Sequence, residues 1–423
     1  MRFIYTFGIC CYALGVRIAA LFNPKAKLMV AGWKRAFGQL AMAPVGQTRT
    51  VWFHASSLGE YEQARPVLNA FRQEHPEYKV CVTFFSPSGY EVRKNTPEAD
   101  FVCYLPMDTR ANARRFVNLL RPTVAFFVKY DYWFNYLEQL RMRGIPTYMF
   151  SAIYRPDQYF FRWYGTWYMR QLKDCFHHIF VQNETSLKLL QTHGVDHCSI
   201  AGDTRFDRVH QIVEAAERNE VVESWLEGYG GKVLVCGSTW PPDEEALAAV
   251  RKANTDWFPG RIILAPHVIG EEHLRQIERL FPDSVRYSRL VGSPEEGNSG
   301  LSGKAGVLII DNIGILSKLY RYGDVAYIGG GFGRGIHNIL EAVTFGKPVV
   351  FGPNYHKFQE ACDIIARGGG WSYQRHEALQ AALETLLRDD VAYARAVEAC
   401  HRYMEENLGA TEKILSQVNP NNF

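Results

Sequence analysis

Short apolar runs alternate with longer segments of helical periodicity from Thr50 onward. The apolar runs are rich in β-branched and aromatic residues and are bounded by glycine, proline or polar clusters, a pattern typical of buried strands. Strands that alternate with helices form βαβ units, whose strands run parallel within one sheet. The expected strands are TVWFHA (50–55), KVCVTFF (79–85), FVCYLP (101–106), TVAFFVK (123–129), PTYMFSA (146–152), HIFVQN (178–183), CSIAGD (198–203), KVLVCGST (232–239), RIILAP (261–266), VRYS (285–288), GVLIID (306–311), VAYIGG (325–330) and PVVFGP (348–353).

The strand pattern pauses at a polar connector, 208–231, and then restarts, which predicts two wound α/β domains facing a cleft. We expect the first domain over 36–215, the second over 230–395, and a C-terminal helix and tail over 396–423. The chain has 423 residues, a length that fits two or three domains with cores of their own. Its 47% hydrophobic and 22% charged residues exclude a disordered chain.

The N-terminal segment, 1–35, is expected to attach the protein to a membrane. An uncharged run from Phe3 to Val16 is interrupted by Arg17 and continues to Phe22, a borderline length for a span. Basic residues follow it and outnumber the one before it, which favours a cytoplasmic body and attraction to anionic lipids. Whether the segment spans or lies on the membrane stays open, and a signal peptide or a buried helix are the alternatives.

The charge distribution and the cysteine content indicate which partners the protein binds and whether its surroundings are oxidising or reducing. Residues 1–59 hold seven basic residues and no acidic one, so the rest of the chain is net negative although the whole carries +3. A basic groove for nucleic acid is therefore not expected. The nine cysteines are scattered without a C-x-x-C pair, which fits a reducing cytoplasm and predicts no zinc site.

A glycine-rich loop, Gly329–Gly335, directly follows an expected strand and precedes an expected helix, HNILEAV (337–343). It does not match G-x-G-x-x-G, so the dinucleotide fingerprint is absent. The loop is expected either to bring an anion such as a phosphate to a helix N-terminus or to be a tight turn without a ligand. Glu341 is expected either to accept hydrogen bonds from a ribose or to be a solvated acid.

Glu60 follows the first expected strand at the start of a helix. A carboxylate in that loop is a candidate general base, held ionised by the helix N-terminus. The spacing Ser57-x-x-Glu60 is also that of a capping box, which needs no catalysis.

Ten of the 21 residues between Tyr148 and Tyr168 are aromatic, with Arg155 and Arg162 interleaved. Aromatic rings combined with cations favour a contact for an amphiphilic, anionic acceptor, made by Arg155, Arg162, Trp163 and Trp167. The alternative is an ordinary helix packing face.

Five segments together resemble the 3-deoxy-D-manno-octulosonic acid (Kdo) transferases of Gram-negative bacteria. They are HASSLGEYEQARP (54–66), VKYDYWFN (128–135), AGDTRFDRV (201–209), LAPHVIGEEH (264–273) and GRGIHNILEAVTFGKPVVFGPNYHKFQEA (333–361). The resemblance implies a GT-B glycosyltransferase with two Rossmann-like domains, an acceptor domain followed by a CMP-sugar donor domain, and a C-terminal helix that crosses back. It also implies transfer of Kdo from CMP-Kdo to a lipid A precursor at the cytoplasmic face of the inner membrane, with inversion and with no metal or other cofactor.

The resemblance also assigns site residues. The catalytic base falls on Glu60, and Asp131 and Arg205 stand where the family usually has Glu and Lys. The CMP site falls on Pro266 and His267, on Ile313, Gly314 and Ile315, and on Asn338, Ile339, Leu340 and Glu341. The family often has Arg-His at 266–267 and Met-Gly-Glu at 313–315, so side-chain contacts from that Arg and Glu are not expected here. The expected partners are CMP-Kdo, a lipid A precursor and membrane lipids.

Two other functions share parts of this pattern. Another GT-B nucleotide-sugar enzyme, such as a UDP-sugar transferase or an epimerase, would keep the glycine loop and Glu341. A membrane-tethered binding protein would keep the fold without turnover. The segment HASSLGE disfavours the epimerase, and the intact Glu60 disfavours the binding protein.

Overall fold

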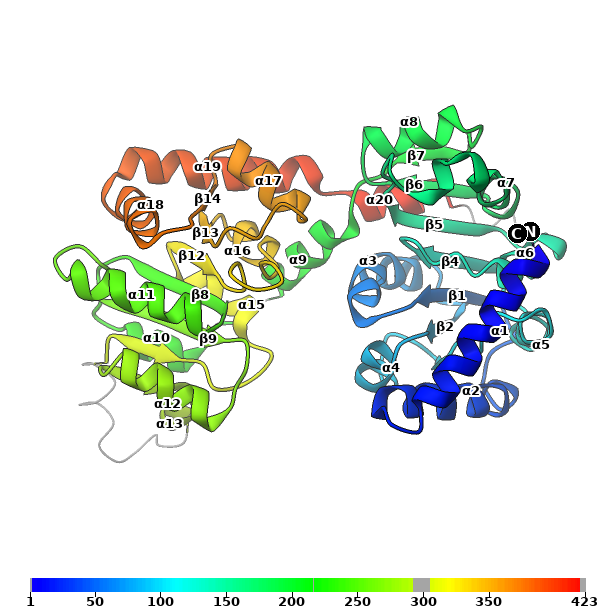
Figure 1. Ribbon diagram of the computed structural model, residues 1–423, viewed down its shortest axis with the longest axis horizontal. Helices are drawn as coiled ribbons and strands as arrows, with labels where there is room; N and C mark the ends of the chain where they lie inside the picture. Colours follow the sequence, from blue (N-terminus) through cyan, green and yellow to red (C-terminus); the bar gives the residue numbers. More distant parts are fainter. Residues whose placement is uncertain (1, 216, 292–304, 419–423) are drawn as a thin grey trace. The chain divides into compact units, whose positions relative to one another are not determined.

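The computed structural model describes residues 2–215, 217–291 and 305–418 and divides into two compact α/β units. The first unit runs to Arg208 and takes up the chain again from Asn407, and the second comprises Val209–Glu406 (Figure 1). Each unit is built on one seven-stranded sheet whose pairings are all parallel. The predicted fold class, two wound parallel-sheet domains, is confirmed.

The sheet of the first unit has the strand order β3-β2-β1-β4-β5-β6-β7. Because successive side chains of a strand point to opposite faces, Val51 and Phe53 join one buried cluster and Trp52 the other. The strands are β1 Thr50–Ala55, β2 Lys79–Phe84, β3 Phe101–Tyr104, β4 Val124–Val128, β5 Thr147–Ala152, β6 His178–Val181 and β7 Cys198–Ile200.

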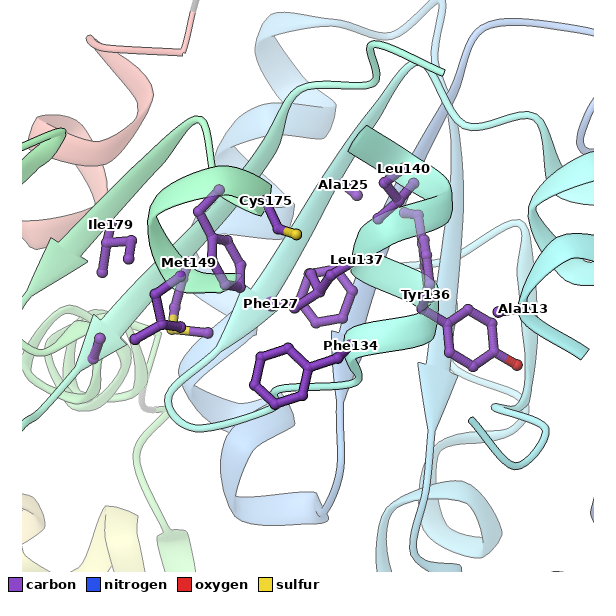
Figure 2. Close-up of a cluster of buried hydrophobic side chains, with 14 of the residues drawn as sticks. Ala113, Ala125, Phe127, Phe134, Tyr136, Leu137, Leu140, Met149, Cys175 and Ile179 are labelled. Atoms are coloured by element: carbon purple, nitrogen blue, oxygen red, sulfur yellow. The ribbon is translucent and has the colours of Figure 1, made fainter. Parts of the chain in front are cut away.

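Helices cover both faces of this sheet. Helices α5 (Arg110–Leu120), α6 (Phe134–Met142) and α7 (Thr166–Cys175) pack on the face that carries Trp52. Figure 2 shows the side chains of Phe134 and Leu137 of α6 gathered beside Phe127 of β4. Helix α3 (Leu58–Glu74) covers the other face together with the C-terminal α20 (Ala410–Leu415). The remaining helices are α4 (Pro87–Arg93), η1 (Tyr159–Phe161), η2 (Trp163–Gly165), α8 (Glu184–Thr192) and α9 (Thr204–Glu214), the last of which runs on into the second unit.

The N-terminus forms two helices, α1 (Arg2–Ala19) and α2 (Pro24–Ala41), that pack on the first unit. Tyr5 of α1 donates a hydrogen bond to the buried Asp108 at 2.6 Å, and Ala13 is buried. The outer side of α1 is apolar and exposed at Phe3, Ile4, Phe7, Leu14 and Ile18. Within the described residues, no helix combines the length and the hydropathy of a bilayer span, so the expected N-terminal anchor is not confirmed.

The sheet of the second unit has the strand order β10-β11-β9-β8-β12-β13-β14. Its last strand, Gly370–Ser372, is not among the strands expected from the sequence, because three residues with a glycine and a serine give no alternating pattern. The strands are β8 Val233–Thr239, β9 Arg261–Pro266, β10 Ser284–Arg286, β11 Val307–Ile309, β12 Val325–Ile328, β13 Val349–Phe351 and β14 Gly370–Ser372. The helices are α10 Glu220–Leu226, α11 Pro241–Ala253, α12 Glu271–Leu280, α13 Tyr287–Val291, α15 Leu316–Leu319, η3 Tyr320–Tyr322, α16 Leu340–Thr344, α17 Gln359–Ala366, α18 His376–Arg388 and α19 Asp390–Asn407.

The first sheet reverses its strand order between β1 and β4, and the second does so between β8 and β12, with β10 and β11 exchanged at its edge. In open α/β sheets, ligands bind outside the carboxyl ends of the strands at such a reversal, because the loops diverge there. The loops after β1, β4, β8 and β12 are therefore the places to look for a site.

Asp207 fixes the start of α20 on the first unit. Its carboxylate accepts hydrogen bonds from the amides of Gly409 and Thr411 at 2.8 and 2.7 Å and from the Thr411 hydroxyl at 2.6 Å. Asp207→Ala should lower the free energy of unfolding by about 1–3 kcal/mol, because half-buried donors of Gly409 and Thr411 lose their acceptor. Hydrogen exchange should accelerate in α20. Glu214→Ala, at the exposed end of the same α9, is the control, and equal protection of α20 in both variants would contradict this role.

Candidate functional site

Glu60 lies in the first turn of α3, directly after β1. Ser57 caps this helix: its Oγ accepts from the Glu60 amide at 3.5 Å and donates to Glu60 Oε2 at 2.8 Å. The serine half of the predicted capping box is therefore present, and the hydroxyl of the same serine orients the Glu60 carboxylate. Capping and a catalytic role do not exclude each other at this position.

Asp131 reaches the same place from the loop after β4. Its Oδ2 accepts from the Ser56 amide at 3.0 Å, and its Oδ1 accepts from the Ser56 hydroxyl at 2.5 Å. The side chain is only 12% exposed, and burial, followed by the negative charge of Glu60, raises the pKa of Asp131 well above its usual value. Two carboxyl groups from neighbouring switch-point loops thus lie within electrostatic reach of each other.

A buried histidine, His54, lies beside Asp131. His54 Nε2 accepts from the Trp133 indole at 2.8 Å, so its proton sits on Nδ1, which lies 2.8 Å from the Thr83 hydroxyl. Burial lowers the pKa of His54 to about 3, so the ring is neutral at physiological pH. His54 Nε2 also lies 3.6 Å from Asp131 Oδ2. A lone pair rather than a cation faces Asp131, in keeping with the raised pKa of that carboxyl.

Arg205, at the start of α9, belongs to the same cluster. Its Nε donates to Asp203 Oδ2 at 2.8 Å, and Gln63 of α3 donates to Asp203 Oδ1 at 2.7 Å. Burial would raise the pKa of Asp203, but the charges of Arg205 and Lys129 and these hydrogen bonds hold it below its usual value. Asp203 is therefore an ionised anchor that fixes the guanidinium.

Tyr130 stands among these charges and was not among the predicted site residues. Burial raises its pKa, and its hydroxyl feels the charges of Arg155, Arg205, Asp203 and Glu60. The structure thus brings Glu60, Asp131, Arg205 and Arg155 together. Tyr130 directly precedes Asp131 in VKYDYWFN, and this position next to a predicted site residue could have indicated it.

The aromatic segment 148–168 has two parts. Tyr148, Phe150, Tyr154 and Phe160 are buried in the core. Trp167 is half-buried against Tyr5 and Phe134, with ring centroids 6.0 and 5.0 Å away. Trp163 is 89% exposed, and Arg155 and Arg162 are exposed as well. Trp163 and the two arginines form an available surface, whereas Trp167 packs mainly within the protein.

The predicted CMP residues lie at the end of β9, in the loops after β9, β11 and β12, and at the start of α16 in the second unit. Pro266 is buried, and His267 beside it is exposed. Ile313 is 90% exposed, and Gly314 has φ +97°, a backbone conformation that favours glycine. Ile315 precedes α15.

The glycine loop differs from its prediction in one respect. The expected helix begins only at Leu340 and has five residues, because Asn338 Oδ1 accepts from the Leu340 amide at 3.2 Å and ends the loop there. The expected helix is present but begins at Leu340 rather than at His337, and an anion at its N-terminus stays a prediction. Ile339 and Leu340 are buried and offer only backbone atoms to a ligand, whereas Asn338 Nδ2 donates to the half-buried Glu341 at 3.1 Å.

Metal-ligating side chains do not gather in the described part of the chain: no group of three or more His, Cys, Asp or Glu residues there has the geometry to hold an ion.

Comparison with known proteins points to one family. The model of the family described as 3-deoxy-D-manno-octulosonic-acid transferase (Kdotransferase) matches residues 31–208. A 3-deoxy-D-manno-octulosonic acid transferase of Haemophilus influenzae is 24% identical over 99% of this chain and 98% of its own. The enzyme of the same name from Bordetella pertussis is 27% identical over 89% of each chain.

Among solved structures, the UDP-GlcNAc 2-epimerase of Neisseria meningitidis bound to UDP-GlcNAc superposes with a TM-score of 0.59. It is 15% identical and covers 87% of this chain and 98% of its own. At that identity the likeness concerns the fold alone.

The raised pKa of Asp131 predicts a pH-dependent gain in stability when its charge is removed. When folding raises the pKa of a carboxyl, that group stabilises the folded protein at pH values below its pKa in the unfolded chain, near 3.8. This contribution is lost as the pH rises through the pKa of the folded state. Asp131→Asn should therefore raise the melting temperature at pH 7.5, and the difference should vanish near pH 3.

Asp100→Asn is the matched control for this prediction. The Val80 amide and Lys79 outweigh the burial of Asp100 and lower its pKa, so its substitution should destabilise the protein at pH 7.5. Thermal melts between pH 3 and 8 compare the two variants. A lower melting temperature of Asp131→Asn at pH 7.5 would show that the carboxyl is ionised at no cost.

Proposed function

The chain belongs to the 3-deoxy-D-manno-octulosonic acid (Kdo) transferase family, and from this premise we propose that it moves Kdo from CMP-Kdo to a lipid A precursor. It is a glycosyltransferase of lipopolysaccharide core biosynthesis that takes its sugar from a nucleotide-linked donor. We propose that the donor is CMP-Kdo and that the acceptor is a lipid A precursor. The observation that carries it is Glu60, oriented by Ser57 at the strand-order reversal of the first unit.

In the proposed reaction, Glu60 removes the proton from an acceptor hydroxyl. The electron pair left on that acceptor oxygen forms the new bond to the anomeric carbon of Kdo. The bond from this carbon to the CMP phosphate breaks on the opposite side, which inverts the anomeric centre. The phosphate keeps the electron pair, and the proton stays on Glu60 until solvent takes it. General-base assistance of this kind contributes typically about 10²–10⁴-fold to a rate.

Asp131 and Arg205 complete the proposed catalytic group. Asp131, with its raised pKa, can carry a proton beside Glu60 and so leave the negative charge on the base. Arg205, held by Asp203, places a positive charge in the same cluster, where it favours the approach of an anionic substrate. Asp131 is one methylene shorter than glutamate, and its two hydrogen bonds to Ser56 hold it on the β1 loop.

For the donor, we propose the exposed loops after β9, β11 and β12 as the CMP site. His267, the backbone of 313–315, Asn338 and Glu341 offer hydrogen-bonding groups there, and the carboxylate of Glu341 suits ribose hydroxyls. Transfer without a metal is part of this proposal. A UDP-sugar substrate is the second candidate, and the transfer assay below decides between them through the nucleotide that is released.

We also propose that the protein works at the cytoplasmic face of the inner membrane, with α1 lying on the lipid surface. The inner side of α1 is held by Asp108 and by packing of Ile9, Ala13 and Val16, so lipid cannot surround the helix. Its outer side presents large apolar side chains, and Lys25, Lys27, Lys34 and Arg35 follow it. This arrangement is typical of interfacial helices that bind anionic membranes. Arg155, Arg162 and Trp163 are the proposed contact for the lipid acceptor.

Glu60→Gln should lower turnover by about 10²–10⁴-fold and leave CMP affinity unchanged, because the proton acceptor is lost while the second unit is untouched. The assay follows CMP released from CMP-Kdo with a lipid A precursor. Glu74→Gln, at the other end of α3, is the control for a surface charge change. Near-normal turnover in a folded Glu60→Gln protein would leave the residue as a helix cap only.

Two variants should separate membrane binding from acceptor capture. Replacing Phe7 and Leu14 with Ser should weaken binding to vesicles of anionic lipid, because the outer side of α1 loses apolar area. Trp163→Ala should leave vesicle binding intact and raise the apparent KM for the lipid acceptor. Val391→Ser, an exposed apolar residue of the second unit, is the control for both measurements. Unchanged vesicle binding of the α1 variant would refute the interfacial role, and an unchanged KM of Trp163→Ala would refute the acceptor contact.

A further inference from the structure

Three aromatic rings meet at the carboxyl ends of the strands where the order of the second sheet reverses. Trp240 follows β8, His267 follows β9, and His337 lies in the loop after β12. The ring of His267 stacks on Trp240 with centroids 4.8 Å apart and on His337 at 4.4 Å, with interplanar angles of 26° and 28°. Trp240 Nε1 donates to His337 Nε2 at 3.2 Å. The indole and the imidazole of His337 are thus joined edge to edge, and His267 lies over both.

The hydrogen bond from Trp240 decides which nitrogen of His337 carries the proton. An indole N–H is only a donor, so His337 Nε2 must be the acceptor, and the proton of the neutral ring sits on Nδ1. Burial, followed by the charge of His267, lowers the pKa of His337, which favours this neutral form. His337 therefore has one fixed donor, Nδ1–H, and the exposed ring of His267 lies beside it with an N–H donor of its own.

Buried acids hold the three loops in place. Asp243 accepts from the amides of Trp240 and Gly330, both at 2.9 Å, and so joins the loops after β8 and β12. His273 connects Glu244 at 2.8 Å to the Val268 carbonyl at 2.9 Å, which fixes the loop that carries His267.

Glycine is required where the loop after β12 passes His337. Gly330 has φ +92°, and a Cβ there would lie 3.0 Å from the ring of His337. The backbone of the loop after β12 therefore fixes where the ring of His337 lies.

We infer that Trp240 is a positioning residue, which holds His337 and His267 as a pair of hydrogen-bond donors for the anionic phosphate of the nucleotide donor. The inference rests on the proposed function and adds to it the part of the donor that this pair binds. Negative charge grows on that phosphate as the sugar leaves, so donors fixed beforehand stabilise it without reorganising. Neither Trp240 nor His337 is among the residues that the sequence assigned to the donor site.

The test compares CMP with cytidine, which lacks the phosphate. Trp240→Phe keeps an aromatic ring over His267 but removes the N–H that fixes His337. Calorimetry with the full chain should show CMP bound about tenfold more weakly, the order of one hydrogen bond to a charged group, and cytidine affinity unchanged. Trp257→Phe is the matched control: its indole also donates a 3.2 Å hydrogen bond, to Asn254, but it precedes β9 at the opposite end of the sheet.

Two measurements distinguish positioning from general support. The 15N shifts of the His337 ring report its tautomer, which should be single in the wild type and mixed in Trp240→Phe. In a His337→Ala background, which keeps the loop and removes only the ring, Trp240→Phe should weaken CMP binding no further. Additive losses in this double-mutant cycle would overturn the inference.

Two other patterns of CMP and cytidine binding would also contradict phosphate binding by this pair. Parallel losses for CMP and cytidine would mean that the rings stack on the base, and unchanged CMP affinity with an altered His337 tautomer would mean that they hold no phosphate. Either result overturns the inference while leaving Kdo transfer intact. Wild-type protein that binds CMP more tightly than cytidine yet transfers no Kdo would refute the proposed function instead.

Discussion

A buried carboxylate joins the two switch-point loops in each unit, and both candidate sites depend on that connection. In the first unit, Asp131 from the loop after β4 binds the backbone and hydroxyl of Ser56 from the loop after β1. In the second, Asp243 binds the amides of Trp240 after β8 and Gly330 after β12. Loops that diverge at a strand-order reversal have no common ladder to pair their backbones, so a side chain must satisfy those amides.

This way of building a site costs stability. Burial raises the pKa of both Asp131 and Asp243, so the ionised form of each is disfavoured where it lies. Three residues other than glycine with positive φ lie near the same carboxyl ends: Lys129 after β4, Ser151 in β5 and Ser238 in β8. Strained backbone and buried charge persist only where the surrounding structure holds them, and they concentrate at functional sites. Their position agrees with chemistry at these loops.

The sequence predicted what depends on local pattern. Apolar runs located thirteen of the fourteen strands, and the Ser57 spacing predicted the cap that orients Glu60. The pairing of Ser56 with Asp131 spans 75 residues, and the bond from Trp240 to His337 spans 97, so no local pattern encodes either. The aromatic run was only partly a surface, because periodicity does not tell a buried ring from an exposed one within a single turn. The helix expected from His337 begins only at Leu340 because the Asn338 side chain accepts from the amide two residues on, a local hydrogen bond that competes with helix formation.

Helix α1 is connected through Asp108 to the start of α6. Tyr5 binds Asp108, and Asp108 also accepts the amides of Asn135 and Tyr136, which open α6 directly after the segment that carries Asp131. Trimming the N-terminus to obtain a protein that is easier to handle in aqueous buffer would therefore remove one support of the loop that carries Asp131. Rates measured on such a trimmed protein would include the effect of a loosened loop after β4. The full chain keeps the contacts made by the inner side of α1 and is the form in which a rate can be measured without that disturbance.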